Sequence, residues 1–97
     1  MLNSKQRAKL RSLAQKIQPV TQVGKSGITE NFLDNLNNAI EKRELVKVTV
    51  LENSGEDIKA CGEEIANRLP AEFVAATGRK LVFYRRSADE KAEHIEI

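Results

Sequence analysis

The sequence predicts an α/β two-layer sandwich in which helices pack on a mixed four-stranded sheet. Two observations support this fold class. Three segments carry apolar residues at helical spacing, and four shorter runs are rich in β-branched or aromatic residues. The segments follow the order α-β-α-β-α-β-β, and right-handed crossovers would place the second and third helices on one face of the sheet. We expect residues 1–97 to form a single domain with a modest core.

The first helix is expected over residues 4–18. Asn3 or Ser4 can cap its start, and Pro19 ends it because proline cannot continue a helix. Basic side chains flank the face that packs on the core and remain in solvent. That face is a narrow apolar stripe formed by Leu10, Leu13, Ala14 and Ile17.

The second helix is expected from about residue 30 to residue 43. Thr29 is its candidate N-cap. Ile28 before the helix and Leu33 within it sit at the two positions of a hydrophobic staple. A staple fixes the angle at which the chain enters the helix, so we expect the preceding loop to be held in place.

The third helix is expected over about residues 55–69. Ser54 and Asp57 form a weak capping-box pattern at its start, and Pro70 ends it. Gly62 falls on the inner face, where glycine costs roughly 1 kcal/mol of helix propensity. This cost predicts that another part of the chain approaches the Gly62 backbone closely.

Strands are expected at residues 20–23, 45–51, 72–77 and 80–85. The second is the clearest, because its valines alternate with polar residues. Gly78 marks the turn of a hairpin between the last two strands. The core of the domain should end near residue 86. Residues 87–97 form a charged tail that we expect to be mobile or, at most, to add an edge strand.

The stretch Gly24-Lys25-Ser26-Gly27 lies between the first strand and the second helix. Glycine lets a backbone turn sharply and lets another molecule approach it closely. The unpaired amides at a helix start attract anions, so the stretch fits a phosphate site. The glycine pair alone is a weak motif, and without other evidence a tight strand-to-helix turn is its default interpretation. A P-loop is excluded, because its motif needs a glycine five residues before Gly24, where this chain has Pro19.

Basic charge is concentrated in two parts of the chain. Residues 1–27 contain six basic side chains and no acidic one, although the net charge of the whole chain is only +2. Segregated positive charge suits a polyanionic partner, although an ordinary solvated helix face would give the same pattern. The second basic group surrounds the last hairpin and consists of Arg79, Lys80, Arg85 and Arg86.

Catalytic and metal sites find little support. The single histidine, His94, lies in the tail, and the single cysteine, Cys61, falls on a buried helix face. We therefore expect no enzyme activity, no cofactor, no metal and no small-molecule substrate. No apolar run is long enough to span a membrane, and a lone cysteine fits a reducing, cytoplasmic location. Aromatic residues are few, and Tyr84 is the one candidate for stacking on a base.

Several short patterns occur together in one order along residues 3–86. They are Lys-Gln-Arg-x-x-Leu-Arg-x-Leu-Ala at 5–14, Pro19-Val20, Val23-Gly24-Lys25-Ser26-Gly27-Ile28-Thr29, Glu44-Leu45-Val46-Lys47-Val48 and Gly78-Arg79-Lys80-Leu81-Val82-Phe83-Tyr84-Arg85. In this order they resemble the CRM domain family, named for chloroplast RNA splicing and ribosome maturation. Because the chain is one domain long, it resembles the small stand-alone bacterial form, the YhbY-like proteins.

The resemblance implies an RNA-binding domain whose fold is similar to the C-terminal domain of a bacterial translation initiation factor. It implies binding to ribosomal RNA in precursors of the large (50S) subunit. The RNA-contacting loop that it implies is Gly24, Lys25, Ser26 and Gly27. We expect a monomer whose electrostatic footprint is widened by Arg7, Arg11, Arg79, Lys80 and Arg85.

The tail departs from the family pattern because it is acidic, which questions any role for it in RNA binding. Its acidic residues are Asp89, Glu90, Glu93 and Glu96. The alternative function is a protein–protein adaptor whose basic face meets an acidic partner. A nucleotide-binding enzyme is the remote third possibility.

Overall fold

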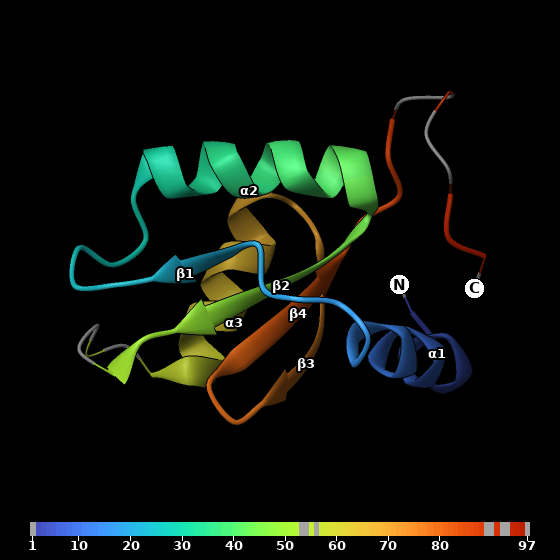
Figure 1. Cartoon of the computed structure of the whole chain (residues 1–97), viewed down its shortest axis with the longest axis horizontal. Helices are drawn as coiled ribbons and strands as arrows, with labels where there is room; N and C mark the ends of the chain where they lie inside the picture. Colours follow the sequence, from blue (N-terminus) through green and yellow to red (C-terminus); the bar gives the residue numbers. More distant parts are fainter. Residues whose placement is uncertain (1, 53–54, 56, 89–90, 92–93, 97) are drawn as a thin grey trace.

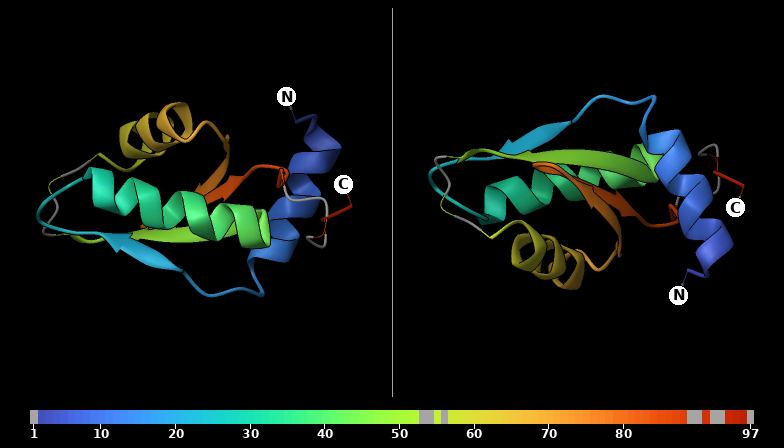
Figure 2. Two further views of the ribbon diagram at one scale, coloured as in Figure 1. Left: turned by 90° about the horizontal axis from the view of Figure 1, so that it is seen from above. Right: turned by 90° about the horizontal axis from the view of Figure 1, so that it is seen from below.

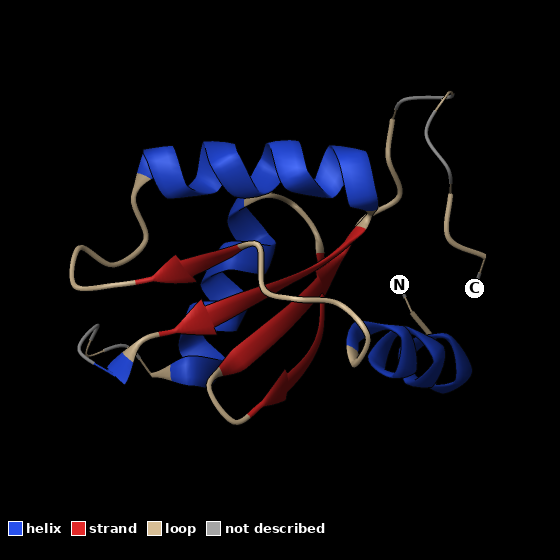
Figure 3. Cartoon of the chain, in the orientation of Figure 1, coloured by secondary structure: helices blue, strands red, loops and turns tan. Residues whose placement is uncertain are grey.

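The computed structural model of the chain describes residues 2–52, 55, 57–88, 91 and 94–96 (Figure 1). Within these residues the helices and strands follow the predicted order (Figure 3). They are α1 (Ser4–Ala14), β1 (Thr21–Val23), α2 (Glu30–Arg43), β2 (Leu45–Val50), α3 (Ile58–Arg68), β3 (Glu72–Thr77) and β4 (Lys80–Tyr84).

The strands form one mixed sheet in the order β1-β2-β4-β3. β1 runs parallel to β2, and β4 runs antiparallel to both β2 and β3. The hairpin therefore returns β4 to the centre of the sheet, between β2 and β3. This arrangement confirms the predicted mixed four-stranded sheet.

One face of the sheet is covered by α2 and α3, as predicted. Alternate residues of β2 and β4 point toward these helices and join a single core with α2 and α3. In Figure 1 the strands pass in front of α3, which lies behind them. The fully buried members of this core include Leu36, Ile40, Val46, Val48, Val50, Ile65, Leu81 and Phe83.

α1 packs on the opposite face of the sheet and covers only one end of it (Figure 2). Leu10 and Ala14 are buried there against Leu45, Val82 and Tyr84. These partners lie at one end of the central strands, where β2 begins and β4 ends. The other end of the same face carries no helix, and this uncovered part becomes important below.

α1 ends at Ala14, four residues earlier than predicted. The amides of Gln15, Lys16 and Ile17 bond to carbonyls three residues back, at 3.1 to 3.3 Å, which is the pattern of a tight turn. The residue before a proline also disfavours helical geometry, so Pro19 acts on the chain before its own position. Ile17 still packs against the α1 cluster.

α3 begins at Ile58 rather than near residue 55. Its N-cap is Asp57, whose carboxylate accepts a hydrogen bond from the Ala60 amide at 2.9 Å. Ser54, the other expected capping residue, lies outside the described residues. The predicted close contact at Gly62 is confirmed, because a Cβ placed there would lie 2.5 Å from the Phe73 ring.

Two residues of the tail, His94 and Ile95, contact Glu44, whereas the mobility of the tail stays a prediction. Glu44 is fully buried, and its φ of 65° lies in the left-handed region. Its carboxylate accepts hydrogen bonds from the amides of Ser87 (2.6 Å) and Ile95 (2.7 Å), and His94 Nδ1 lies 2.5 Å away. The described residues after β4 form no strand.

Candidate nucleic-acid interface

The glycine loop leaves the sheet at the end of β1 and closes as a tight turn. The Gly27 amide donates to the Gly24 carbonyl at 2.9 Å, and Gly27 has a φ of 72°, which favours glycine. Gly24 differs, because a Cβ there would make only an ordinary contact, 3.7 Å from Leu51. The turn itself thus requires glycine at 27, whereas the fold has room for a side chain at 24.

Lys25 and Ser26 form the exposed tip of this loop. No side-chain partner of Lys25 occurs among the described residues, so its ammonium group points into solvent. The loop is anchored at both ends. Before the loop, the Val23 carbonyl accepts a hydrogen bond from the Leu51 amide at 2.9 Å, and after it Ile28 packs on the core. Because the backbone of the turn is already held, a ligand that binds Lys25 has to order only the lysine side chain.

The start of α2 is a weaker anion site than the sequence suggested. Thr29 caps it, and its hydroxyl accepts a hydrogen bond from the Phe32 amide at 3.0 Å. Glu30, in the first turn, adds a negative charge that would repel a phosphate. Lys25 is therefore the principal source of attraction for an anion at this loop.

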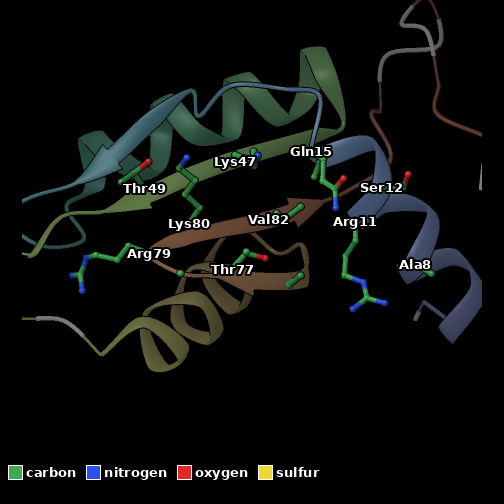
Figure 4. Close-up of a pocket in the computed structure, with 13 residues that line it drawn as sticks. Ala8, Arg11, Ser12, Gln15, Lys47, Thr49, Thr77, Arg79, Lys80 and Val82 are labelled. Carbon is green, nitrogen blue, oxygen red and sulfur yellow. The ribbon is translucent and has the colours of Figure 1, made fainter.

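A groove lies on the uncovered part of the sheet, between α1 and the β3–β4 hairpin (Figure 4). We call it the open-face groove. Its volume is about 780 Å³. Figure 4 shows Arg11 on α1 and Gln15 at the end of this helix, beside the ends of the strands. The groove is lined by Ala8, Arg11, Ser12, Ala14, Gln15, Lys47, Thr49, Ala75, Thr77, Gly78, Arg79, Lys80 and Val82.

The lining of the open-face groove is strongly positive. It includes the four basic residues Arg11, Lys47, Arg79 and Lys80, and none of the described residues that line it is acidic. Arg11 and Lys80 are exposed and have no side-chain partner in the described part of the chain. Lys47 makes one long hydrogen bond, 3.3 Å, to the Ile17 carbonyl. Positive charge with no counter-charge in the groove attracts polyanions.

The glycine loop and the groove meet at the same end of the sheet. Val23, the last residue of β1, pairs with Val50, whose amide donates to the Arg79 carbonyl at 2.7 Å. Two inter-strand steps therefore separate the end of β1 from the hairpin turn, a span of roughly 10 Å. A chain of phosphates crossing this end of the sheet would pass both features.

Arg79 ties the hairpin to the end of β2. Its Nε donates to the Val50 carbonyl at 2.7 Å, and its Nη2 donates to the Leu51 carbonyl at 2.9 Å. The planar fork of arginine suits two neighbouring carbonyls in this way. Arg79 therefore supplies positive charge at a fixed position between the glycine loop and the groove.

Two other predicted arginines are also bonded within the fold. Arg7 Nη1 donates to the carbonyls of Phe73 (2.7 Å) and Val74 (2.9 Å), where the pairing of β3 with β4 shifts register. Arg85 donates to the Leu69 carbonyl (2.9 Å) and forms an ion pair with Glu41 at 3.3 Å. Neither residue lines the groove, and their contact with RNA stays a prediction.

Tyr84 is only 8% exposed beneath α1, which contradicts its candidacy for stacking on a base. Burial raises its pKa, and the negative charge of Glu44 acts in the same direction. Cys61 is 1% exposed in the main core, as expected from its helix face. Over the described ranges, no cluster of His, Cys, Asp or Glu is arranged to hold a metal ion, and no helix is long and apolar enough to cross a membrane.

Lys47 and Thr49 were missed as candidate site residues. Their signal was present in the sequence, since they are the polar members of the alternating β2 strand. What the sequence did not reveal is that α1 stops short and leaves these two side chains uncovered. Thr77 was missed as well, although the sequence placed it at the end of an expected strand.

An α/β domain with a basic groove on its open sheet face and an exposed lysine on a neighbouring glycine loop has the features of a nucleic-acid-binding module. Comparison with known proteins then defines the family. Residues 2–85 match the model of the CRS1 / YhbY (CRM) domain. The chain belongs to this family, as the sequence resemblance indicated.

Relatives of similar length carry RNA-binding names. YqeI of Bacillus subtilis, named a probable RNA-binding protein, is 37% identical over 94% of this chain and 95% of its own length. A Haemophilus influenzae protein named RNA-binding protein is 34% identical over 95% of this chain and 93% of its own length. The solution structure of a Staphylococcus aureus protein, SAV1595, for which RNA binding has been suggested, has a TM-score of 0.79 and 41% identity. That comparison covers 98% of this chain and all of the other.

Proposed function

We propose that this chain is a non-enzymatic, cytoplasmic RNA-binding protein that acts on ribosomal RNA during assembly of the large subunit. The names of the relatives and the family support RNA as the partner. The observation that carries the proposal is the basic groove, free of acidic lining residues, beside an exposed lysine loop. The large-subunit precursor is the target that the family resemblance implies.

The glycine loop would act as a clamp on the RNA backbone. Lys25 would contribute its charge, Ser26 a hydroxyl and an amide, and Gly24 a backbone without a side chain in the way. The argument for Gly24 is the space at that position, because the fold does not need glycine there. The groove would continue the contact across the sheet.

The loop is tested by Lys25→Glu. Because Lys25 is exposed and unpaired among the described residues, the variant should keep the thermal stability of the wild-type chain. RNA affinity, measured by fluorescence anisotropy at fixed salt, should fall by about tenfold or more. The matched control is Lys42→Glu, an identical charge change in the last turn of α2, far from the loop. Equal effects of the two substitutions would contradict a specific role for the loop.

The ribosomal target needs a separate experiment. A tagged chain in growing bacteria should co-sediment with precursors of the large subunit, and ultraviolet crosslinks should map to one region of the large ribosomal RNA. The Lys25→Glu variant should lose both signals. Co-sedimentation that survives ribonuclease treatment, with no RNA crosslinks, would instead support an adaptor that binds an acidic protein.

A further inference from the structure

The open-face groove contains two kinds of polar side chain. Those of Arg11, Lys47 and Lys80 are hydrogen-bond donors only and match phosphate oxygens, which only accept. Those of Ser12, Gln15, Thr49 and Thr77 both donate and accept, and the two threonines are the members of this kind that lie on the strands. The hydroxyls of these two threonines have no hydrogen-bond partner within the described part of the chain.

The sheet register places part of this set in a straight line. Gln22 pairs with Thr49, Thr49 with Lys80, and Lys80 with Thr77. Directly paired residues point to the same face, so this row of polar side chains crosses all four strands. Its length is roughly 14 Å, three inter-strand steps. We call it the cross-strand row.

The rest of the groove limits what can bind. Among the described residues its lining contains no aromatic side chain, and these residues therefore offer no platform on which a base could stack. α1 walls one side, and this makes the site concave rather than a flat platform for a wide helix. The chemistry that fits is a single extended strand whose sugar and phosphate groups face the sheet.

A ribose differs from a deoxyribose by the 2′-hydroxyl, which both donates and accepts hydrogen bonds. Thr49 and Thr77 have this same dual capacity and lie on either side of Lys80 in the cross-strand row. A phosphate held by Lys80 would bring the adjoining sugars within reach of the two hydroxyls. The row therefore has the chemistry to distinguish RNA from DNA.

We propose that the open-face groove binds the sugar–phosphate backbone of a single RNA strand and that Thr49 and Thr77 select RNA over DNA through the 2′-hydroxyl. This proposal rests on the proposed function and adds the place where RNA is distinguished from DNA. It separates two roles: the glycine loop attracts any polynucleotide backbone, and the cross-strand row recognises ribose.

The test is the double substitution Thr49→Val and Thr77→Val. Valine keeps the branched shape and the strand preference, so the fold should persist, which a thermal melt checks. Affinity is measured at one salt concentration for an unstructured RNA oligonucleotide, the DNA of the same sequence, and an RNA hairpin. The ratio of RNA to DNA affinity should fall by about fivefold to tenfold for the single strands, with DNA affinity nearly unchanged.

Lys25→Gln is the contrasting variant. It should weaken RNA and DNA binding alike and leave their ratio unchanged. If wild-type chain prefers RNA but the threonine variant keeps the full preference, the groove proposal fails and RNA binding itself stands. The groove proposal is also overturned if the wild-type chain binds RNA and DNA with equal affinity. It is overturned as well if the threonine substitutions weaken binding of the RNA hairpin alone. If the wild-type chain binds no RNA, the proposed function fails first.

Discussion

The salt dependence of RNA binding provides a quantitative test of the interface. Each protein cation that neutralises a phosphate releases a bound counterion, which lowers the slope of log affinity against log salt by about 0.7 for a single strand. Four cations in the glycine loop and the open-face groove are not committed to strong internal bonds: Lys25, Arg11, Lys47 and Lys80. If all four contact phosphates, the slope should be about −2.8.

Single charge removals should change this slope in equal steps. Lys80→Gln and Arg11→Gln alter exposed side chains without internal partners among the described residues, so each should make the slope less negative by about 0.7. Lys42→Gln, at the distal end of α2, should leave it unchanged. The assay is fluorescence anisotropy over a series of potassium chloride concentrations with one unstructured RNA. The reasoning is refuted if Lys80→Gln and Lys42→Gln give the same slope as wild type.

Three further predictions concern the fold that supports this surface. Gly62→Ala should destabilise the domain by about 1 kcal/mol in a thermal melt, because overpacking against Phe73 costs more than the gain in helix propensity. In a Phe73→Leu background the same substitution should become neutral or stabilising. Glu44→Gln should lower the unfolding free energy by about 3 kcal/mol, because the amides of Ser87 and Ile95 lose a charged acceptor. Unchanged stability in a urea titration would contradict the role of this carboxylate. The unfolding free energy should also fall in acid, because the pKa of Glu44 is held below its usual value. Burial acts to raise this pKa, but hydrogen bonds from His94, Ser87 and Ile95 outweigh the effect of burial. A lowered pKa stabilises the fold above the unfolded value, so stability should fall as the pH drops below about 4.3, and less steeply in Glu44→Gln.

Local sequence signals predicted the elements of this fold well. α2 has the predicted boundaries and the predicted N-cap, Thr29, because capping and helical spacing agree there. The alternation in residues 45–51 similarly fixed which face of β2 is buried. These features depend on neighbours a few residues apart, and such interactions are visible in the sequence.

Several features that depend on distant contacts were not predicted. Arg7 was assigned to the RNA surface from its charge, yet its guanidinium satisfies carbonyls 66 and 67 positions further along the chain. Those carbonyls are available to accept hydrogen bonds from Arg7 because the pairing of β3 with β4 shifts register at that point. The sequence of residues 72–77 did not predict the shift. The buried Glu44 escaped prediction for the same reason, since its partners lie 43 to 51 residues away.

The basic residues of this domain thus divide into those that bond within the fold and those that remain exposed. Arg7, Arg79 and Arg85 each use the planar guanidinium to bond main-chain carbonyls, at a register shift, a strand end and a helix end. Two lysines at the interface, Lys25 and Lys80, remain exposed. These arginine hydrogen bonds hold β3 and β4 in place, and the position of these two strands sets the shape of the open-face groove. The arginines that stabilise the fold therefore position the surface on which the exposed cations, the lysines and Arg11, can bind a polyanion.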